Sequence, residues 1–424
     1  MHTEVSKESV LLLGDYRQSL TVARSLHRAG YRVMLGSADP RPVTAMSRYI
    51  AERWQHPPLS DSQAWQAAIR AFCSSRPDVR IIYPIGDLEI AASMPIASSL
   101  PALVVAVEER VFELCQHKRS LLELAARVGV ATERWELVTE PSGLADAAER
   151  IGYPVAIKPD GGANEELGFK AVIANGPADL DRINAVSAFP PAGFIIQQFG
   201  NGPRHNVYFI ARHGRLLGSG EIVTLRTDCP DGTGLSVEGL SVQPSPLLLE
   251  HTKALIAALE YTGAGCAQFL VDETTGDTCF LEINSRLGAN CAAVCRCGLD
   301  LPKLFIEVLR GPIAPQPAAK TGHSYVWLLG DVEGLLDSRK RLSVSSVFWW
   351  IARSMMALLR AQDHITWDWR DPFPSIVMMK RLVSRMLRRT ARSLGLGPPR
   401  HSRQILIDSR VTGLVRRISS SGDR

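Results

Sequence analysis

The most chemically informative stretch of this chain is residues 265–286, with the sequence GCAQFLVDETTGDTCFLEINSR. Its composition fits two short strands joined by a turn, so we expect a hairpin. Side chains alternate across a strand, which places Glu282 and Asn284 on the same face. A turn centred near Thr275 puts Gln268 directly across from Glu282. One face of the hairpin is therefore expected to present an amide, a carboxylate and a second amide.

Oxygen donors of this kind suit a hard divalent cation, because Mg²⁺ is commonly bound by one or two carboxylates together with phosphate oxygens. Arg286, two residues beyond Asn284, adds a fixed cation for a phosphoryl group that gains negative charge. The alternative is an ordinary surface hairpin whose polar residues face water. Polar residues that recur on one face beside otherwise apolar strands favour the metal site.

Two further stretches are candidates for a nucleotide site. In GYPVAIKP, residues 152–159, Lys158 is expected at the end of a strand, where a cation can meet phosphates, although a single lysine there is more often solvated. The apolar residues 194–199 run into the glycine turn of GNGPRHNVYFIA, and a second strand begins near His205. Such a strand pair suits an adenine ring, which needs apolar walls and backbone hydrogen bonds to its edge.

The elements that must position these residues change along the chain. Apolar runs separated by a helix-like stretch predict a parallel βαβ arrangement at the start. The expected elements there are strands over residues 10–13, 31–35, 79–84 and 102–107 and a helix over residues 19–29. Asp15, Asp87 and Glu89 follow two of these strands and are candidates for a ligand cleft, although single carboxylates there more often cap helices.

Beyond this region, apolar periodicity predicts one helix over residues 113–128, which carries Lys118 and stops at Gly129. Short strands and hairpins are expected from there to residue 284, and the proline-rich residues 311–318 are typical of a linker. The chain is therefore expected to contain more than one domain.

The composition fits a globular enzyme of two or three domains, since 46% of the 424 residues are hydrophobic, 21% are charged and the net charge is only +5. The apolar run at residues 10–13 is too short for a signal peptide, and no stretch reaches the roughly 18 uncharged apolar residues of a membrane-spanning helix. A cytoplasmic location is expected. Cys291, Cys295 and Cys297 match no common zinc spacing, which favours buried thiols over a metal or redox site.

Taken in order, these stretches resemble the ATP-grasp superfamily, in particular its carbamoyl-phosphate synthase and biotin carboxylase branch. The resemblance covers roughly residues 10–310, and its most specific part is Glu282, Asn284 and Arg286 preceded by Gln268. It implies an α/β and α+β fold class with three parts. These are a small parallel α/β pre-ATP-grasp domain (residues 1–112), an ATP-grasp domain (113–312, with a mobile lid over roughly 135–192) and a mainly helical, basic C-terminal segment (319–424).

The resemblance also implies roles for individual residues. Arg286 and Lys158 match catalytic positions, and the metal ligands for Mg²⁺ (or Mn²⁺) match Gln268, Glu282 and Asn284. The positions that match ATP contacts are Lys118, Lys158, Gln197, Gln198, Gly200 and His205. Two features depart from the family pattern: Gln197-Gln198 stands where a glutamate is common, and the loop after Lys158 is poor in glycine and contains Glu165 and Glu166.

The implied reaction activates a substrate carboxylate as an acyl phosphate, which an amine, or less often a thiol, then attacks. Two alternatives remain open. One is a carbamoyl-phosphate-synthase-like phosphotransferase that releases a phosphorylated product. The other is a nucleotide-binding scaffold that has lost catalysis.

The C-terminal segment, residues 321–424, lies outside the strong resemblance. It combines an apolar, aromatic stretch at residues 345–360 with an arginine-rich tail. A helical cap on the enzyme core is favoured over peripheral contact with an anionic membrane, and nucleic acid binding is not expected because no stacking platform accompanies the arginines. The expected partners are small carboxylate and amine substrates and, since dimers are common among similar proteins, a second copy of the chain.

Overall fold

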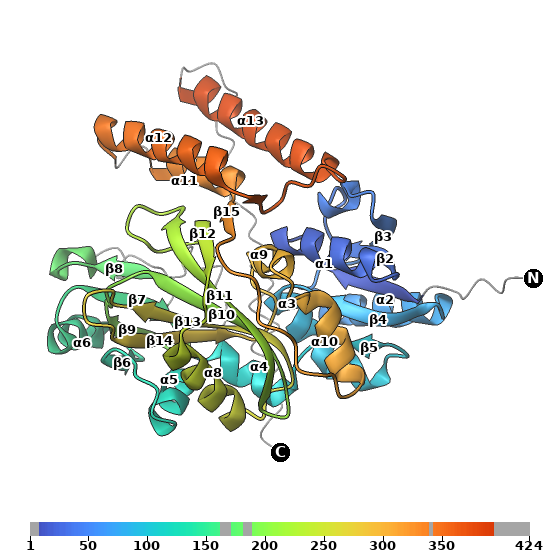
Figure 1. The fold of residues 1–424 in the computed structure, drawn as a ribbon, viewed down its shortest axis with the longest axis horizontal. Helices are drawn as coiled ribbons and strands as arrows, with labels where there is room; N and C mark the ends of the chain where they lie inside the picture. Colours follow the sequence, from blue (N-terminus) through green and yellow to red (C-terminus); the bar gives the residue numbers. More distant parts are fainter. Residues whose placement is uncertain (1–7, 162–170, 181–188, 339–341, 394–424) are drawn as a thin grey trace, which may run out of the picture. The chain divides into compact units, whose positions relative to one another are not determined.

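The computed structural model describes residues 8–161, 171–180, 189–338 and 342–393 of the 424-residue chain. The described residues form two compact units (Figure 1). Unit 1 contains the residues up to Ala106 together with those from Thr366 onward, and unit 2 contains Val107–Ile365. The predicted C-terminal segment, residues 319–424, is thus shared between the two units.

Unit 1 is built on a five-stranded parallel sheet in the order β3-β2-β1-β4-β5. The central strand β1 is buried along its whole length, as expected for a short apolar run in a parallel sheet. The strands are β1 (Ser9–Leu13), β2 (Arg32–Ser37), β3 (Ile50–Gln55), β4 (Val79–Pro84) and β5 (Leu103–Val104). The helices before residue 106 are α1 (Arg17–Arg28), α2 (Ser62–Ser75) and α3 (Asp87–Ser93). The predicted parallel α/β arrangement is confirmed.

The sequence-based prediction missed β3 and α2. Strand β3 has the sequence IAERWQ, and every second residue is exposed to solvent. It lies at the edge of the sheet, so only one face is covered and no continuous apolar run marks it. Glu52 in β3 forms ion pairs with Arg32 and Arg76 on its partly covered face, which further hides the strand pattern in the sequence.

A buried carboxylate connects the C-terminal part of unit 1 to its N-terminal part. Asp371 is fully buried and accepts hydrogen bonds from Arg24 Nε at 3.0 Å, Ser47 Oγ at 2.7 Å and the backbone N–H of Arg48 at 2.9 Å. Helix α13 (Phe373–Ser393) begins two residues later. Asp371 therefore joins the start of α13 to α1 and to the loop at residues 47–48, and residues 366–393 form part of unit 1.

Unit 2 contains two sheets. A four-stranded antiparallel sheet has the order β6-β9-β7-β8, and a larger seven-stranded sheet has the order β14-β13-β10-β11-β12-β15-β16. The smaller sheet comprises β6 (Trp135–Val138), β7 (Val155–Pro159), β8 (Val172–Ala174) and β9 (Phe194–Gln198). The larger comprises β10 (Arg204–Arg212), β11 (Arg215–Thr227), β12 (Ser236–Val242), β13 (Gly263–Val271), β14 (Thr278–Asn284), β15 (Ser324–Val326) and β16 (Asp363–His364).

The helices of unit 2 connect and flank these sheets (Figure 1). They are α4 (Glu109–Gln116), α5 (Lys118–Arg127), α6 (Leu144–Ile151), α8 (Pro246–Ala258), α9 (Cys291–Arg296), α10 (Leu301–Arg310), α11 (Leu328–Ser338) and α12 (Val344–Arg360). The single helix predicted over residues 113–128 is wrong. His117 has an extended backbone (φ −97°, ψ 109°), which ends α4 and lets α5 start afresh at Lys118.

Residues beyond the predicted linker complete the larger sheet of unit 2. Strand β15 pairs with β12, and β16 pairs with β15. Asp331 in α11 accepts two hydrogen bonds from the Arg226 guanidinium in β11 and one from Trp350 Nε1 in α12. This network holds both helices on the sheet. Among the described residues no helix is long and apolar enough to cross a membrane.

Candidate active site

The hairpin of β13 and β14 has the predicted register. Gln268 pairs directly with Glu282. Ile283 is only 2% exposed, whereas Glu282 and Asn284 are partly exposed on the other face. Asn284 Nδ2 donates a hydrogen bond to Glu282 Oε1 at 3.0 Å, so the two side chains lie together as expected.

The amide nitrogens on this face are engaged within the protein. Gln268 Nε2 donates to Asn206 Oδ1 at 3.0 Å, and Asn206 Nδ2 in turn donates to the Ile222 carbonyl and to Thr224 Oγ1. With its NH₂ group used in this way, Gln268 presents its amide oxygen beside the Glu282 carboxylate. A carboxylate with two amide side chains beside it offers oxygen donors of the kind that suit a hard divalent cation.

The smaller sheet contributes a lysine at the end of β7. Lys158 Nζ donates to Gln197 Oε1 in β9 at 3.0 Å. Asp160, two residues later, accepts a hydrogen bond from the backbone N–H of Arg119 at 3.2 Å. Because Arg119 is the second residue of α5, this bond ties the start of α5, and with it Lys118, to the end of β7.

The charges of these groups influence one another strongly. Burial raises the pKa of Glu282, but the positive charges of Lys118 and Lys158, with the Asn284 hydrogen bond and the charge of Arg204, together outweigh burial and lower the pKa. Burial lowers the pKa of Lys158, and the charge of Glu282 partly opposes this effect. Lys118 and Lys158, which are distant from Glu282 in the sequence, therefore place positive charge near the Glu282 carboxylate. The two lysines can neutralise the negative charge of a polyphosphate, and the carboxylate can bind the divalent cation that the polyphosphate carries.

Two residues of this cluster were missed by the sequence-based prediction. Arg204 acts electrostatically on both Lys158 and Glu282, and Asn206 orients Gln268. Both lie in β10, where Asn206 is paired with Gln268 and Arg204 with Leu270. Strand alternation in GNGPRHNVYFIA signalled that they share a face, but the pairing of β10 with β13 was not foreseen.

Of the two adjacent glutamines, Gln197 is the one whose side chain lies at the cluster. It is 2% exposed, and its Nε2 finds no acceptor among the described residues. Gln198 follows it in β9, so its side chain leaves the opposite face of the sheet, where its Oε1 accepts from Arg134 at 3.2 Å. The structure therefore brings Gln197 to the cluster and leaves the side chain of Gln198 outside it.

His205 also lies outside the cluster. Its neighbours Arg204 and Asn206 share a face of β10 with the site, so alternation directs His205 to the other face. There His205 Nδ1 and Glu221 Oε1 lie 2.6 Å apart, and Glu221 Oε2 accepts from the backbone N–H of Ser245 at the start of α8. The position of His205 is explained by this buried structural contact.

Gly200, in the turn between β9 and β10, packs closely against the ends of two side chains. A Cβ there would lie 2.8 Å from Glu133 Oε1 and 2.9 Å from Leu270 Cδ1. Burial raises the pKa of Glu133. The close packing keeps the backbone of this turn near a carboxylate that the sequence-based prediction did not include.

Arg286 follows β14 by two residues. Burial raises the pKa of the Cys266 thiol, and the positive charges of Arg204 and Arg286 oppose this effect. Cys266 is paired with Asn284 across the hairpin. The positive charge of Arg286 therefore acts on the strand pair that carries Glu282.

The cysteine cluster lies in and after α9. Cys291 and Cys297 are buried, all eight cysteines are free thiols, and no group of three or more His, Cys, Asp or Glu side chains in the described part of the chain could hold a metal ion. A hydrogen bond with Cys291 and burial together raise the pKa of Cys295. These features agree with structural thiols.

Unit 1 carries a second polar group at the carboxyl ends of β1 and β4, where the strand order of the sheet reverses. Tyr16 Oη donates to Glu89 Oε2 at 2.8 Å. A Cβ at Gly86 would lie 2.5 Å from both of these oxygens, so a larger residue there would displace the Tyr16–Glu89 pair. Asp15, by contrast, accepts from the backbone N–H groups of Val43 and Thr44 and has the structural role that the sequence left open.

The buried Glu89 carboxyl predicts a pH-dependent stability. Burial raises the pKa of Glu89 from 4.5 to about 7 in the folded protein, although the Tyr16 hydroxyl opposes the shift. As pH rises from 4.5 through about 7, the unfolded state loses this proton before the folded state does, so the free energy of unfolding falls.

The Glu89→Gln variant has no carboxyl group to ionise, so we expect this fall in the free energy of unfolding to be absent. Its stability relative to the wild type should therefore increase as pH rises, by up to roughly 3 kcal/mol above pH 7. Urea unfolding of both proteins at a series of pH values measures the difference. A difference that does not change with pH would show that Glu89 ionises normally in the folded chain.

Glu165, Glu166 and Lys170 of the loop after β7, together with part of the predicted lid, lie outside the described residues.

Comparison with known proteins places the cluster within a recurring domain. Residues 118–312 match the family model described as "Carbamoyl-phosphate synthase L chain, ATP binding domain". The mitochondrial propionyl-CoA carboxylase alpha chain of Homo sapiens is 30% identical over 173 residues, which are 39% of this chain and 24% of that protein. The chain therefore spans about a quarter of the length of this relative.

Solved structures share the fold at low sequence identity. The biotin carboxylase domain dimer of Hydrogenobacter thermophilus 2-oxoglutarate carboxylase, in complex with MgADP, ADP and bicarbonate, has a TM-score of 0.59 and 18% identity, with 75% of this chain and 73% of that chain covered. An L-amino acid ligase from Bacillus licheniformis has a TM-score of 0.57 and 15% identity, with coverage of 73% and 75%.

Proposed function

We propose, from the premise that residues 118–312 form an ATP-grasp domain of the carbamoyl-phosphate synthase L chain type, that this chain is an ATP- and Mg²⁺-dependent ligase. It would activate a carboxylate as an acyl phosphate and couple it to an amine. The observation that carries the proposal is the Glu282 carboxylate, flanked by amide side chains and electrostatically coupled to Lys118 and Lys158.

The residues of the cluster are assigned as follows. Gln268, Glu282 and Asn284 would hold Mg²⁺ or Mn²⁺ through their oxygens, and Lys118 and Lys158 would bind the phosphates of ATP. The buried, unsatisfied Nε2 of Gln197 is a donor for the nucleotide, and the backbone around Gly200 is proposed to line the adenine. The side chains of Gln198 and His205 point away from the cluster, toward Arg134 and Glu221, so their roles in ATP binding are not part of this proposal.

The proposed chemistry relies on positioning and charge. A bound Mg²⁺ would withdraw charge from the β- and γ-phosphate oxygens. Lys118 and Lys158 would neutralise negative charge on the triphosphate. Arg286 faces the phosphoryl group as it passes to the substrate carboxylate. The attacking amine then displaces phosphate and forms the C–N bond.

Within unit 1, the Tyr16–Glu89 pair at the strand ends is a candidate ligand contact, since ligands of open α/β sheets bind where the strand order reverses. The cytoplasmic location and a homodimer remain predictions. The phosphotransferase and the catalytically silent scaffold remain alternatives. A cluster that combines oxygen donors for a metal ion with lysines for phosphates favours an active enzyme.

Release of ADP by the purified chain tests this proposal. With ATP, Mg²⁺ and pools of carboxylates and amines, we expect ADP to form only when one particular pair is present. Hydroxylamine in place of the amine should trap the acyl phosphate as a hydroxamate. A phosphorylated product that accumulates would favour the phosphotransferase, ATP binding without turnover in any pool would favour the scaffold, and absence of ATP binding would contradict the assignment.

A further inference from the structure

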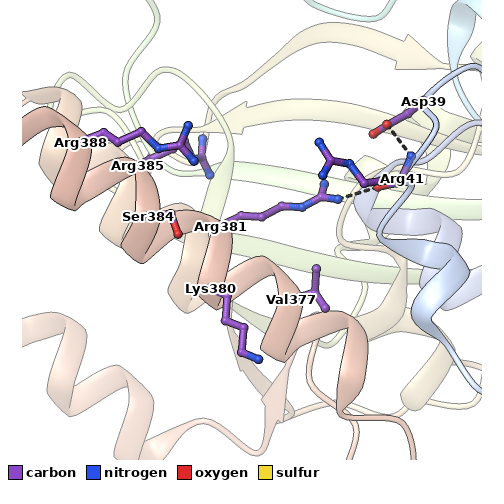
Figure 2. A pocket seen from close by; sticks show the side chains of 8 residues that line it. All are labelled: Asp39, Arg41, Val377, Lys380, Arg381, Ser384, Arg385 and Arg388. Carbon is purple, nitrogen blue, oxygen red and sulfur yellow. Dashed lines mark hydrogen bonds between the residues drawn. The ribbon is translucent and has the colours of Figure 1, made fainter. Parts of the chain in front are cut away.

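Unit 1 contains a strongly basic cavity of about 840 Å³ between α13 and the loop at residues 39–41. Figure 2 shows the charged side chains that line it, most of them from consecutive turns of α13. The lining includes five cations and one carboxylate, namely Arg41, Lys380, Arg381, Arg385, Arg388 and Asp39. The cavity therefore carries a net positive charge.

Two contacts define the wall of this basic cavity. Asp39 Oδ1 accepts from the backbone N–H of Arg41 at 2.8 Å, and Arg381 Nη2 donates to the Arg41 carbonyl at 2.5 Å (Figure 2). Asp39 is the one carboxylate among the described residues that line the cavity. Like charges held this close repel one another, so an anionic ligand that entered would relieve the repulsion.

The same helix exposes an apolar stripe. Ile376, Met379, Val383 and Leu387 follow at intervals of three, four and four residues, and 36%, 42%, 45% and 66% of their surfaces are exposed. At 100° per residue they fall within an 80° arc of the helix. The inward face is marked by Leu382, which is 3% exposed.

The cations that line the cavity occupy the arc next to this apolar stripe. Helix α13 thus has three faces: one packed on unit 1, one apolar and exposed, and one basic. An exposed apolar stripe beside a row of cations is typical of helices that lie in the interface of an anionic bilayer.

Other occupants match only part of this surface. A free polyphosphate would satisfy the cations and leave the apolar stripe in water. A second copy packed stripe to stripe would cover the apolar residues but bring two sets of cations together. An anionic bilayer offers phosphates to the basic cavity and acyl chains to the apolar stripe. We propose that α13 docks unit 1 on an anionic lipid surface, with phosphorylated headgroups in the basic cavity.

Helix α12 of unit 2 carries an apolar stripe of its own. Val344, Phe348, Met355 and Leu359 lie on one side of that helix and are 89%, 68%, 53% and 81% exposed. Residues of α12 do not line the basic cavity. The proposal therefore rests on α13.

Co-sedimentation of the full chain with vesicles tests the proposal. We expect binding to phosphatidylcholine vesicles that contain phosphatidylglycerol, loss of that binding at high salt, and little binding to phosphatidylcholine alone. Lys380→Glu/Arg388→Glu should weaken binding to the anionic vesicles at least ~10-fold. Val383→Asn/Leu387→Asn, which leaves the charge unchanged, should weaken it by ~10-fold as well.

The matched control is Arg70→Glu/Arg80→Glu, which reverses two exposed charges elsewhere in unit 1 and should bind like the wild type. Thermal melts establish that each variant is folded. Binding of inorganic polyphosphate by a wild type that does not bind the anionic vesicles would overturn the lipid assignment in favour of a free polyanion. A wild type that forms dimers but does not bind vesicles, together with loss of the dimer in Val383→Asn/Leu387→Asn, would overturn it in favour of a second copy.

Discussion

Glu282→Gln is expected to reduce Mg²⁺-dependent ATP turnover by about 10³-fold. The carboxylate is the charged member of the donor set on the face of the hairpin, beside Gln268 and Asn284. Glutamine keeps the shape and one oxygen but removes the negative charge, so the bound cation would lose its main electrostatic partner. Lys118 and Lys158 would also lose the opposite charge that they face.

The measurement is ADP release by the substrate pair identified for the wild type, over a range of Mg²⁺ concentrations. Glu273→Gln is the matched control, because Glu273 is exposed in the turn of the same hairpin and should retain wild-type activity. Thermal melts separate lost catalysis from lost folding. Turnover within about threefold of wild type in Glu282→Gln would remove the proposed metal site, since loss of one such charge normally costs far more.

Lys158→Met is the second large effect that we expect. Lys158 is held toward Gln197 at the end of β7, where its charge acts on Glu282. A neutral side chain of similar length would leave the phosphates of ATP without this cation. We expect kcat/KM for ATP to fall by about 10²-fold, with weaker nucleotide binding as part of the loss.

Titration of a fluorescent ATP analogue measures the binding component, and ADP release measures turnover. The control is Lys253→Met on α8, where Lys253 is half exposed and paired with Glu250. Unchanged nucleotide affinity and turnover in Lys158→Met would show that Lys158 is a structural lysine bonded to Gln197 and takes no part in phosphate binding.

The hairpin face with the proposed metal ligands was predictable from the sequence because it depends on local geometry. Alternation along a strand and the length of one turn are enough to place Glu282 beside Asn284 and opposite Gln268, and the observed register agrees. The parallel sheet of unit 1 was predictable for a similar reason, since β1 and β4 are short apolar runs that end in glycine turns.

Other features depend on contacts between segments far apart in the chain. Helical periodicity continues through residues 113–128, yet the chain breaks at His117, where Asp160 from the end of β7 binds the start of α5. His205 and Asn206 are neighbours in sequence, but only pairing of β10 with β13 decides which of them faces the site.

Three features follow from residue order alone: the side chains that recur on one strand face, the parallel sheet of unit 1, and the basic and apolar character of the C-terminal segment. Three others appear only when the chain is folded. The charges of Lys118 and Lys158 act on Glu282, the C-terminal segment is divided between two units, and α13 has a basic cavity beside an exposed apolar stripe. Strand and helix periodicity act over a few residues, whereas buried contacts such as Arg24–Asp371 join groups hundreds of residues apart and leave no local pattern.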